Sequence, residues 1–114
     1  MPGEEPDKIV SGAAEHYPDF APGFVHFTED VVFGDLWMRT ELAPKLRSLV
    51  TVACLTALGA NPVHLRFHLT LALKNGVTEE ELVEALTHLC FYTGWSRATS
   101  ALTVAREILR GENA

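Results

Sequence analysis

Two histidines four residues apart, His64 and His68, are the residues of this sequence best suited to acid–base chemistry. In a helix this spacing places both imidazoles on one face. An imidazole changes its protonation state near neutral pH, so it can act as a general acid or a general base. His68 is surrounded in sequence by leucines and a phenylalanine, and a core histidine with one hydrogen-bonded nitrogen is therefore the structural alternative.

A metal site is not expected at this histidine pair. The HExxH zinc signature needs glutamate directly after the first histidine, and Leu65 occupies that position. No nearby Asp, Glu or Cys completes a set of three ligands. We therefore predict that the pair binds no metal ion.

Aromatic side chains are further candidates for a binding site. His88 and Tyr92 share one helix face by the same spacing, and Trp37 and Trp95 provide large rings. Each of these four side chains also has a structural alternative, as a polar bridge between helices or as ordinary packing.

The basic residues gather around the middle of the chain, at Arg39, Lys45, Arg47 and Arg66. In an acidic protein such a cluster is a candidate anion site. The alternative is a set of solvated side chains on helix faces.

Length and charge exclude several classes of protein. A chain of 114 residues predicts one domain, 1–114, in which residues 1–17 form an N-terminal extension. Nine basic and fifteen acidic residues give a net charge of -6, which argues against a nucleic-acid partner. No apolar run reaches the roughly 18 residues that a membrane-spanning helix needs, so no membrane partner is expected.

The N-terminal residues and the cysteines predict the compartment. The first residues are acidic and lack the apolar core of a secretory signal, so we expect a cytoplasmic protein. Cys54 and Cys90 show no metal-binding spacing and are expected to be small buried hydrophobic residues in a reducing environment.

The pattern of apolar residues predicts an all-α fold of about five or six helices, since no strand-like alternation occurs. The expected helices cover residues 7–17, 44–58, 62–74, 79–92 and 96–109, with an aromatic-rich region of helical spacing at 19–38. Thr78 and Glu81 form a capping box at the start of one helix, and Gly59 and Asn75–Gly76 are helix stops. The helix at 44–58 is apolar almost all round, which predicts burial on several sides and packing against other subunits.

From Phe33 onward the chain resembles the carboxymuconolactone decarboxylase family, which has the alkylhydroperoxidase D-like fold. The stretches that carry the resemblance are FGDLWMRTELAPKLRSLVTVACLTALG, LRFHLTLALKNGVTEEELVEALTHL and FYTGWSRATSAL. The resemblance implies an all-helical subunit in a homo-oligomer, a trimer or a hexamer. It implies decarboxylation of a carboxylated unsaturated lactone in protocatechuate breakdown, a small-molecule substrate and no cofactor.

Several positions depart from the family pattern. The peroxidase branch has a CxxC motif, and its two cysteine positions are Asn61 and His64 here, so thiol peroxidase activity is not expected. Ala43 stands where a small hydroxyl residue is frequent, and Ser96 where proline is usual. Ser48 stands where many members have a glutamate, and a related glutamate in the peroxidases assists proton transfer.

The chemistry of decarboxylation suggests a role for each candidate residue. His68 is assigned as the acid that protonates carbon, and His64 as a donor to the lactone carbonyl. Arg47 is assigned to the substrate carboxylate because a guanidinium can bind it in two places, with Arg39 as the substitute. The remaining substrate-binding candidates are Trp37, His88, Tyr92 and Trp95.

Two other classes of function remain open at this stage. A small helical oligomer could bind a metabolite, or act on another cyclic acid as an isomerase or a dehydratase. A redox partner that uses Cys54 or Cys90 is the third possibility.

Overall fold

The computed structural model describes residues 8–111, and the predictions that concern residues 1–7 lie outside the described residues. The chain divides into two compact units, Met1–Pro44 and Lys45–Ala114, and each is described here by itself. The described residues form helices and no strands, so the predicted all-α fold is confirmed. None of these helices has the length and apolar character needed to cross a membrane.

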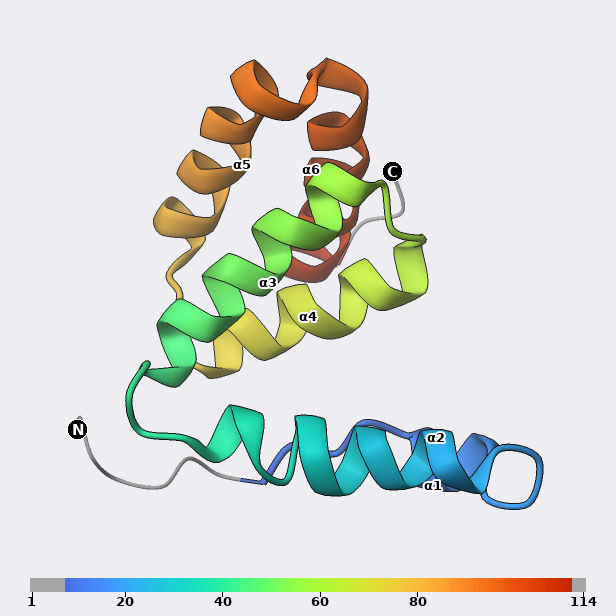
Figure 1. Cartoon of the computed structure of the whole chain (residues 1–114). Coiled ribbons are helices and arrows are strands. Elements are labelled where there is room, and N and C mark those ends of the chain that lie inside the picture. The colour runs from blue at the N-terminus through green and yellow to red at the C-terminus, as the bar shows by residue number, and fades with distance from the viewer. Residues whose placement is uncertain (1–7, 112–114) are drawn as a thin grey trace. The chain divides into compact units, whose positions relative to one another are not determined.

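The first unit contains short helical segments (Figure 1). They are α1 (Ala13–His16), α2 (Pro22–His26), the π-helix η1 (Phe27–Val32) and the 3₁₀-helix η2 (Leu36–Met38). The predicted helix at 7–17 is wrong in its described part, where only four residues are helical. Gly12 precedes α1 with a φ of 85°, a left-handed conformation that an α-helix cannot contain.

The second unit contains four longer helices, each beginning and ending within about one residue of its predicted bounds (Figure 1). They are α3 (Pro44–Leu58), α4 (Pro62–Lys74), α5 (Glu79–Thr93) and α6 (Trp95–Arg110). The predicted capping box is confirmed, because Thr78 Oγ1 accepts from the Glu81 amide at 3.1 Å and Glu81 Oε1 accepts from the Thr78 amide at 2.9 Å. Such a box satisfies two amides that would otherwise be unpaired at the helix start.

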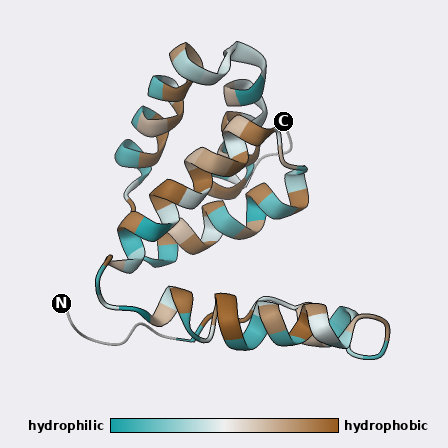
Figure 2. Ribbon diagram, in the orientation of Figure 1, coloured by the Kyte–Doolittle hydropathy of each residue, from teal (hydrophilic) through white to brown (hydrophobic). Residues whose placement is uncertain are grey.

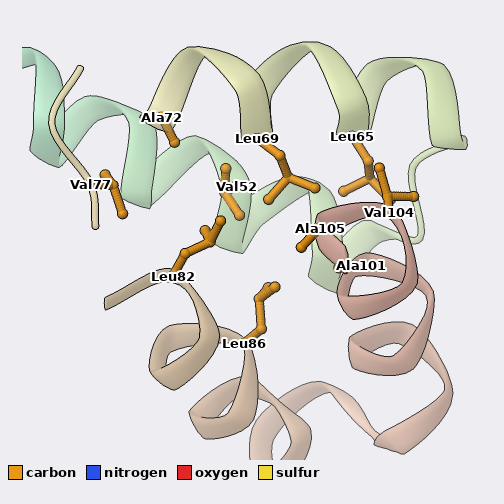
Figure 3. Packing of buried hydrophobic residues seen from close by; sticks show 10 residues of the cluster. All are labelled: Val52, Leu65, Leu69, Ala72, Val77, Leu82, Leu86, Ala101, Val104 and Ala105. Atoms are coloured by element: carbon orange, nitrogen blue, oxygen red, sulfur yellow. The ribbon is translucent and has the colours of Figure 1, made fainter. Parts of the chain in front are cut away.

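The core of the second unit is built from all four helices and the turn before α5 (Figure 3). Leu69, Leu82 and Leu86 are fully buried, and alanines on α4 and α6 allow the helices to approach. The cluster consists of Val52, Leu65, Leu69, Ala72, Val77, Leu82, Leu86, Ala101, Val104 and Ala105. Complete burial of a leucine side chain stabilises a fold by about 1.5–3 kcal/mol, so this cluster is the main source of stability of the unit.

Ion pairs between helices surround this core. Lys45 Nζ of α3 lies 2.9 Å from Glu81 Oε2 of α5. Arg110 of α6 binds Glu79 through both nitrogens, at 2.9 and 2.7 Å, and Arg66 of α4 pairs with Glu107 of α6. These pairs are solvent-exposed, so each contributes little to the stability of the fold.

Helix α3 carries hydrophobic residues along its length (Figure 2). Its inward row, Ser48, Val52 and Thr56, is buried. The prediction that both cysteines are buried is correct for Cys90 and wrong for Cys54, which is exposed. Cys54 is two positions after Val52 in the helix, a rotation of about 200° that turns it away from the core.

Candidate functional site

His68 lies on α4, the helix whose inner face supplies Leu65 and Leu69 to the core. Its ring is partly buried and meets the ring of Phe67 edge to face, with the centroids 4.9 Å apart. Burial lowers the pKa of His68 below its ordinary value of 6.5, and the charge of nearby His64 lowers it further. Burial acts in this direction because it disfavours the charged imidazolium. The imidazole is therefore neutral at pH 7 and becomes charged only in more acidic solution.

His64 is exposed in the first turn of α4, on the same face as His68. The position of this turn is fixed by Asn61, whose Oδ1 accepts from the amides of Val63 and His64 at 2.9 and 3.2 Å. The sequence analysis missed Asn61 as a helix cap. An asparagine directly before a proline at the first helical position is the signal that would have identified it.

Arg47 lies on α3 and is partly buried, with its Nε removed from solvent. Its carbonyl accepts the hydroxyl of Thr51 at 2.8 Å. The next residue, Ser48, is fully buried, and its Oγ accepts from Nδ2 of Asn75 at 3.0 Å. This hydrogen bond connects α3 to the residue that follows α4. Ser48 is the position at which the family resemblance leads us to expect a glutamate.

His88 and Tyr92 lie together on α5, as their spacing predicted. Their rings stack at 4.9 Å with an interplanar angle of 27°. Tyr92 is 76% exposed and Trp95 is 65% exposed, and Trp95 meets Phe91 edge to face at 5.8 Å. These rings form an aromatic surface at the junction of α5 and α6, and within the chain they are largely open to solvent.

Trp37 and Arg39 belong to the first unit. Trp37 is buried and packs against Phe33, with ring centroids 5.9 Å apart. Arg39 is exposed and lies 3.6 Å from the carboxylate of Glu41. The assignment of both residues to substrate binding stays a prediction.

Two grooves formed by described residues of the second unit are lined by residues other than His64, His68 and Arg47. One, of about 420 Å³, runs between α5 and α6 and is lined in part by Val83, Leu102 and Arg106. The other, of about 700 Å³, is open and lined by Glu80, Glu81, Glu84, Ala85 and His88. In the described part of the chain, no three His, Cys, Asp or Glu side chains are placed to hold a metal ion.

Of the candidate catalytic residues, the structure places two on one face of the same helix. It brings His64 and His68 together on α4, and it gives His68 a shifted pKa in a partly apolar setting. Perturbed ionisation of this kind is typical of functional positions. The catalytic roles of His68, His64 and Arg47 remain predictions.

Comparison with known proteins gives a family and two similar enzymes. The model of the carboxymuconolactone decarboxylase family matches residues 22–107. The chain is 36% identical over 104 residues to 4-carboxymuconolactone decarboxylase of Acinetobacter baylyi, which covers 91% of this chain and 77% of that protein. It is 34% identical over 92 residues to nitrosuccinic acid decarboxylase of Metarhizium robertsii, which covers 81% of this chain and 63% of that protein.

Proposed function

Because the chain belongs to the carboxymuconolactone decarboxylase family, we propose that it is a carboxy-lyase that removes carbon dioxide from a carboxylated unsaturated lactone such as 4-carboxymuconolactone. The similarity to two decarboxylases supports the reaction type. The single observation that supports the site is the placement of His68 beside His64, with a lowered pKa. We further propose a cytoplasmic homo-oligomer that acts in aromatic catabolism.

The reaction breaks the bond between the ring carbon and the carboxylate. Carbon dioxide leaves, and the electron pair left on carbon is delocalised through the double bond onto the lactone carbonyl. One proton then adds to carbon, so each turnover consumes one proton. The site must therefore hold a carboxylate, stabilise negative charge at a carbonyl oxygen and deliver a proton.

In the proposed mechanism three residues of the second unit carry these tasks. Arg47 holds a carboxylate through its planar guanidinium. His64 donates a hydrogen bond to the carbonyl oxygen as charge develops there. His68, once protonated, gives its proton to carbon, and its lowered pKa makes the imidazolium a stronger acid than an ordinary one.

The test is release of carbon dioxide from 4-carboxymuconolactone by the purified protein and by the His68→Ala variant. Loss of one such group typically lowers kcat by about 100- to 1000-fold, and we expect this loss here. His16→Ala in α1 is the control, since it removes an exposed histidine of the first unit. Near-normal turnover by a folded His68→Ala variant would contradict the assignment.

The pH dependence gives an independent measurement of the same role. If the protonated form of His68 is active, kcat/KM falls by about tenfold per pH unit above the pKa of His68. Because that pKa lies below 6.5, the fall covers the whole range from about pH 6.5 to 8. A pH-independent kcat/KM in this range would exclude His68 as the acid.

A separate outcome of the carbon dioxide assay would favour the alternative function. If the protein binds the lactone but releases no carbon dioxide, a metabolite-binding role is favoured.

A further inference from the structure

The groove between α5 and α6 is a hollow of the second unit that the proposed mechanism does not use. Its volume is about 420 Å³, within the range of small-molecule sites, which is roughly 300–1,000 Å³. Its lining residues do not include the candidate catalytic residues His64, His68 and Arg47. This groove, called here the α5–α6 groove, can therefore hold a ligand other than the substrate.

The floor of the α5–α6 groove is apolar. Val83 of α5 is 39% exposed, and Leu102 and Leu109 of α6 are half-buried. Ala105 lies between the two leucines along the helix, and its small side chain leaves room above the floor. A ligand with an apolar body would remove these side chains from water, which is favourable in proportion to the area covered.

A polar edge runs along α6 beside this floor. Its members follow one another at intervals of three or four residues, so they form one row on the helix surface. They are Thr99, Thr103, Arg106 and Arg110. At 1.5 Å per residue the row extends over roughly 16 Å. The hydroxyl of Thr103 donates to the carbonyl of Thr99 at 2.9 Å, so the charged side chains lie at one end of the row and the neutral ones at the other.

The charges that line the groove favour an anion. Glu79 is the carboxylate of the lining, and both of its oxygens accept from Arg110, at 2.9 and 2.7 Å. This hydrogen bonding lowers the pKa of Glu79, so the pair stays ionised at neutral pH. Arg106 adds a second guanidinium one helical turn away, so the lining carries one positive charge in excess. A singly charged anion would balance it.

We propose that the α5–α6 groove binds a monocarboxylate with an extended apolar body. The carboxylate lies at the guanidinium of Arg106, which can donate two parallel hydrogen bonds to it. The apolar body lies along Val83, Leu102 and Leu109. The candidate catalytic residues are outside the groove, so this binding is independent of the reaction proposed above.

Two other kinds of ligand match the groove less well. A dianion, such as the lactone that we propose as the substrate, carries one negative charge more than the lining can balance. A neutral apolar molecule would cover the floor but would gain nothing from the excess positive charge. A neutral analogue of the same shape therefore tests the charge requirement directly.

The first experiment titrates the full chain with octanoate, an eight-carbon monocarboxylate, and follows the backbone amides by NMR. We expect saturable shifts at Val83, Leu102 and Leu109. Octanamide, the neutral analogue, should bind about 10- to 100-fold more weakly, because it cannot form charge-assisted hydrogen bonds with a guanidinium. Absence of saturable binding, shifts confined to residues outside the groove, or equal affinities for the two compounds would overturn the proposal.

The second experiment measures octanoate affinity in variants of two exposed lining residues. Arg106→Gln should weaken binding by about tenfold or more, whereas Arg97→Gln removes the same charge from α6 outside the groove and should bind as the wild type does. Val83→Glu should weaken binding similarly, because it places a carboxylate on the floor. Val63→Glu is its matched control, since Val63 is a 73% exposed valine of α4. Wild-type affinity in a folded Arg106→Gln or Val83→Glu variant would show that the ligand lies elsewhere.

Discussion

Two buried hydroxyl groups on α3, Ser48 and Thr56, have different surroundings. Ser48 accepts a hydrogen bond from Asn75 at 3.0 Å. Among the described residues, no group is placed to form a hydrogen bond with Oγ1 of Thr56, although that atom is buried. The two positions therefore allow the effect on stability of a hydrogen-bonded buried hydroxyl to be compared with that of a buried hydroxyl without such a bond.

We predict opposite effects of two similar substitutions. Ser48→Ala leaves the amide of Asn75 without its acceptor and should lower the free energy of unfolding by about 1 kcal/mol. Thr56→Val removes a hydroxyl that makes no such bond and should raise it by up to about 1 kcal/mol. Urea denaturation of both variants measures the difference. Equal destabilisation by the two changes would mean that Thr56 has a polar partner in solution.

At the scale of single residues, the sequence predicts which side chains share a helix face better than it predicts which side chains are buried. The pairing of His64 with His68 and of His88 with Tyr92 follows from helical spacing alone. Exposure does not, because it depends on which side of a helix other elements cover. Cys54 was expected to be buried because its neighbours are apolar, and it is exposed because it lies opposite the inward row of α3.

At the scale of elements, the helices of the second unit could be predicted because their ends carry local signals. Prolines open α3 and α4, Thr78 with Glu81 opens α5, and glycines stand at the ends. The π-helix η1 could not be predicted, since its apolar spacing resembles that of an α-helix. Gly34 follows it, where an added Cβ would lie 2.6 Å from the carbonyl oxygen of Glu29. That contact is recognisable only in three dimensions.

Gly59, the residue that follows α3, allows a test of what stabilises the C-terminal end of this helix. Its φ is 70°, and an added Cβ would overlap Nη1 at the end of the flexible Arg97 side chain on α6. Gly59→Ala should therefore lower the free energy of unfolding by about 1–2 kcal/mol, because alanine is strained in a left-handed backbone conformation, whereas the end of the Arg97 side chain can move aside at little cost.

The two causes can be separated by repeating Gly59→Ala in an Arg97→Ala background. Only the backbone cost remains there, so thermal unfolding should show about the same loss as in the wild type. A smaller loss in the Arg97→Ala background would show that displacement of the guanidinium also lowers stability.

At the scale of the whole molecule, the all-α fold followed from the absence of alternating strands, and the family match agrees with the resemblance stated from sequence motifs. The single domain expected over residues 1–114 remains a prediction. The structure divides at Pro44, and the family match at residues 22–107 includes parts of both units. The division could not be anticipated because no linker-like composition marks residue 44.

The ion pairs of the second unit have a consequence for the rate at which a charged molecule arrives. Lys45, Arg66 and Arg110 are each neutralised by a glutamate, and the chain as a whole carries a net charge of -6. The dianionic lactone that we propose as the substrate therefore approaches against a repulsive long-range field, which salt screens over about 10 Å at 0.1 M. Raising the ionic strength should increase kcat/KM by lowering KM and leave kcat unchanged. A decrease with salt would mean that the field at the mouth of the site is positive.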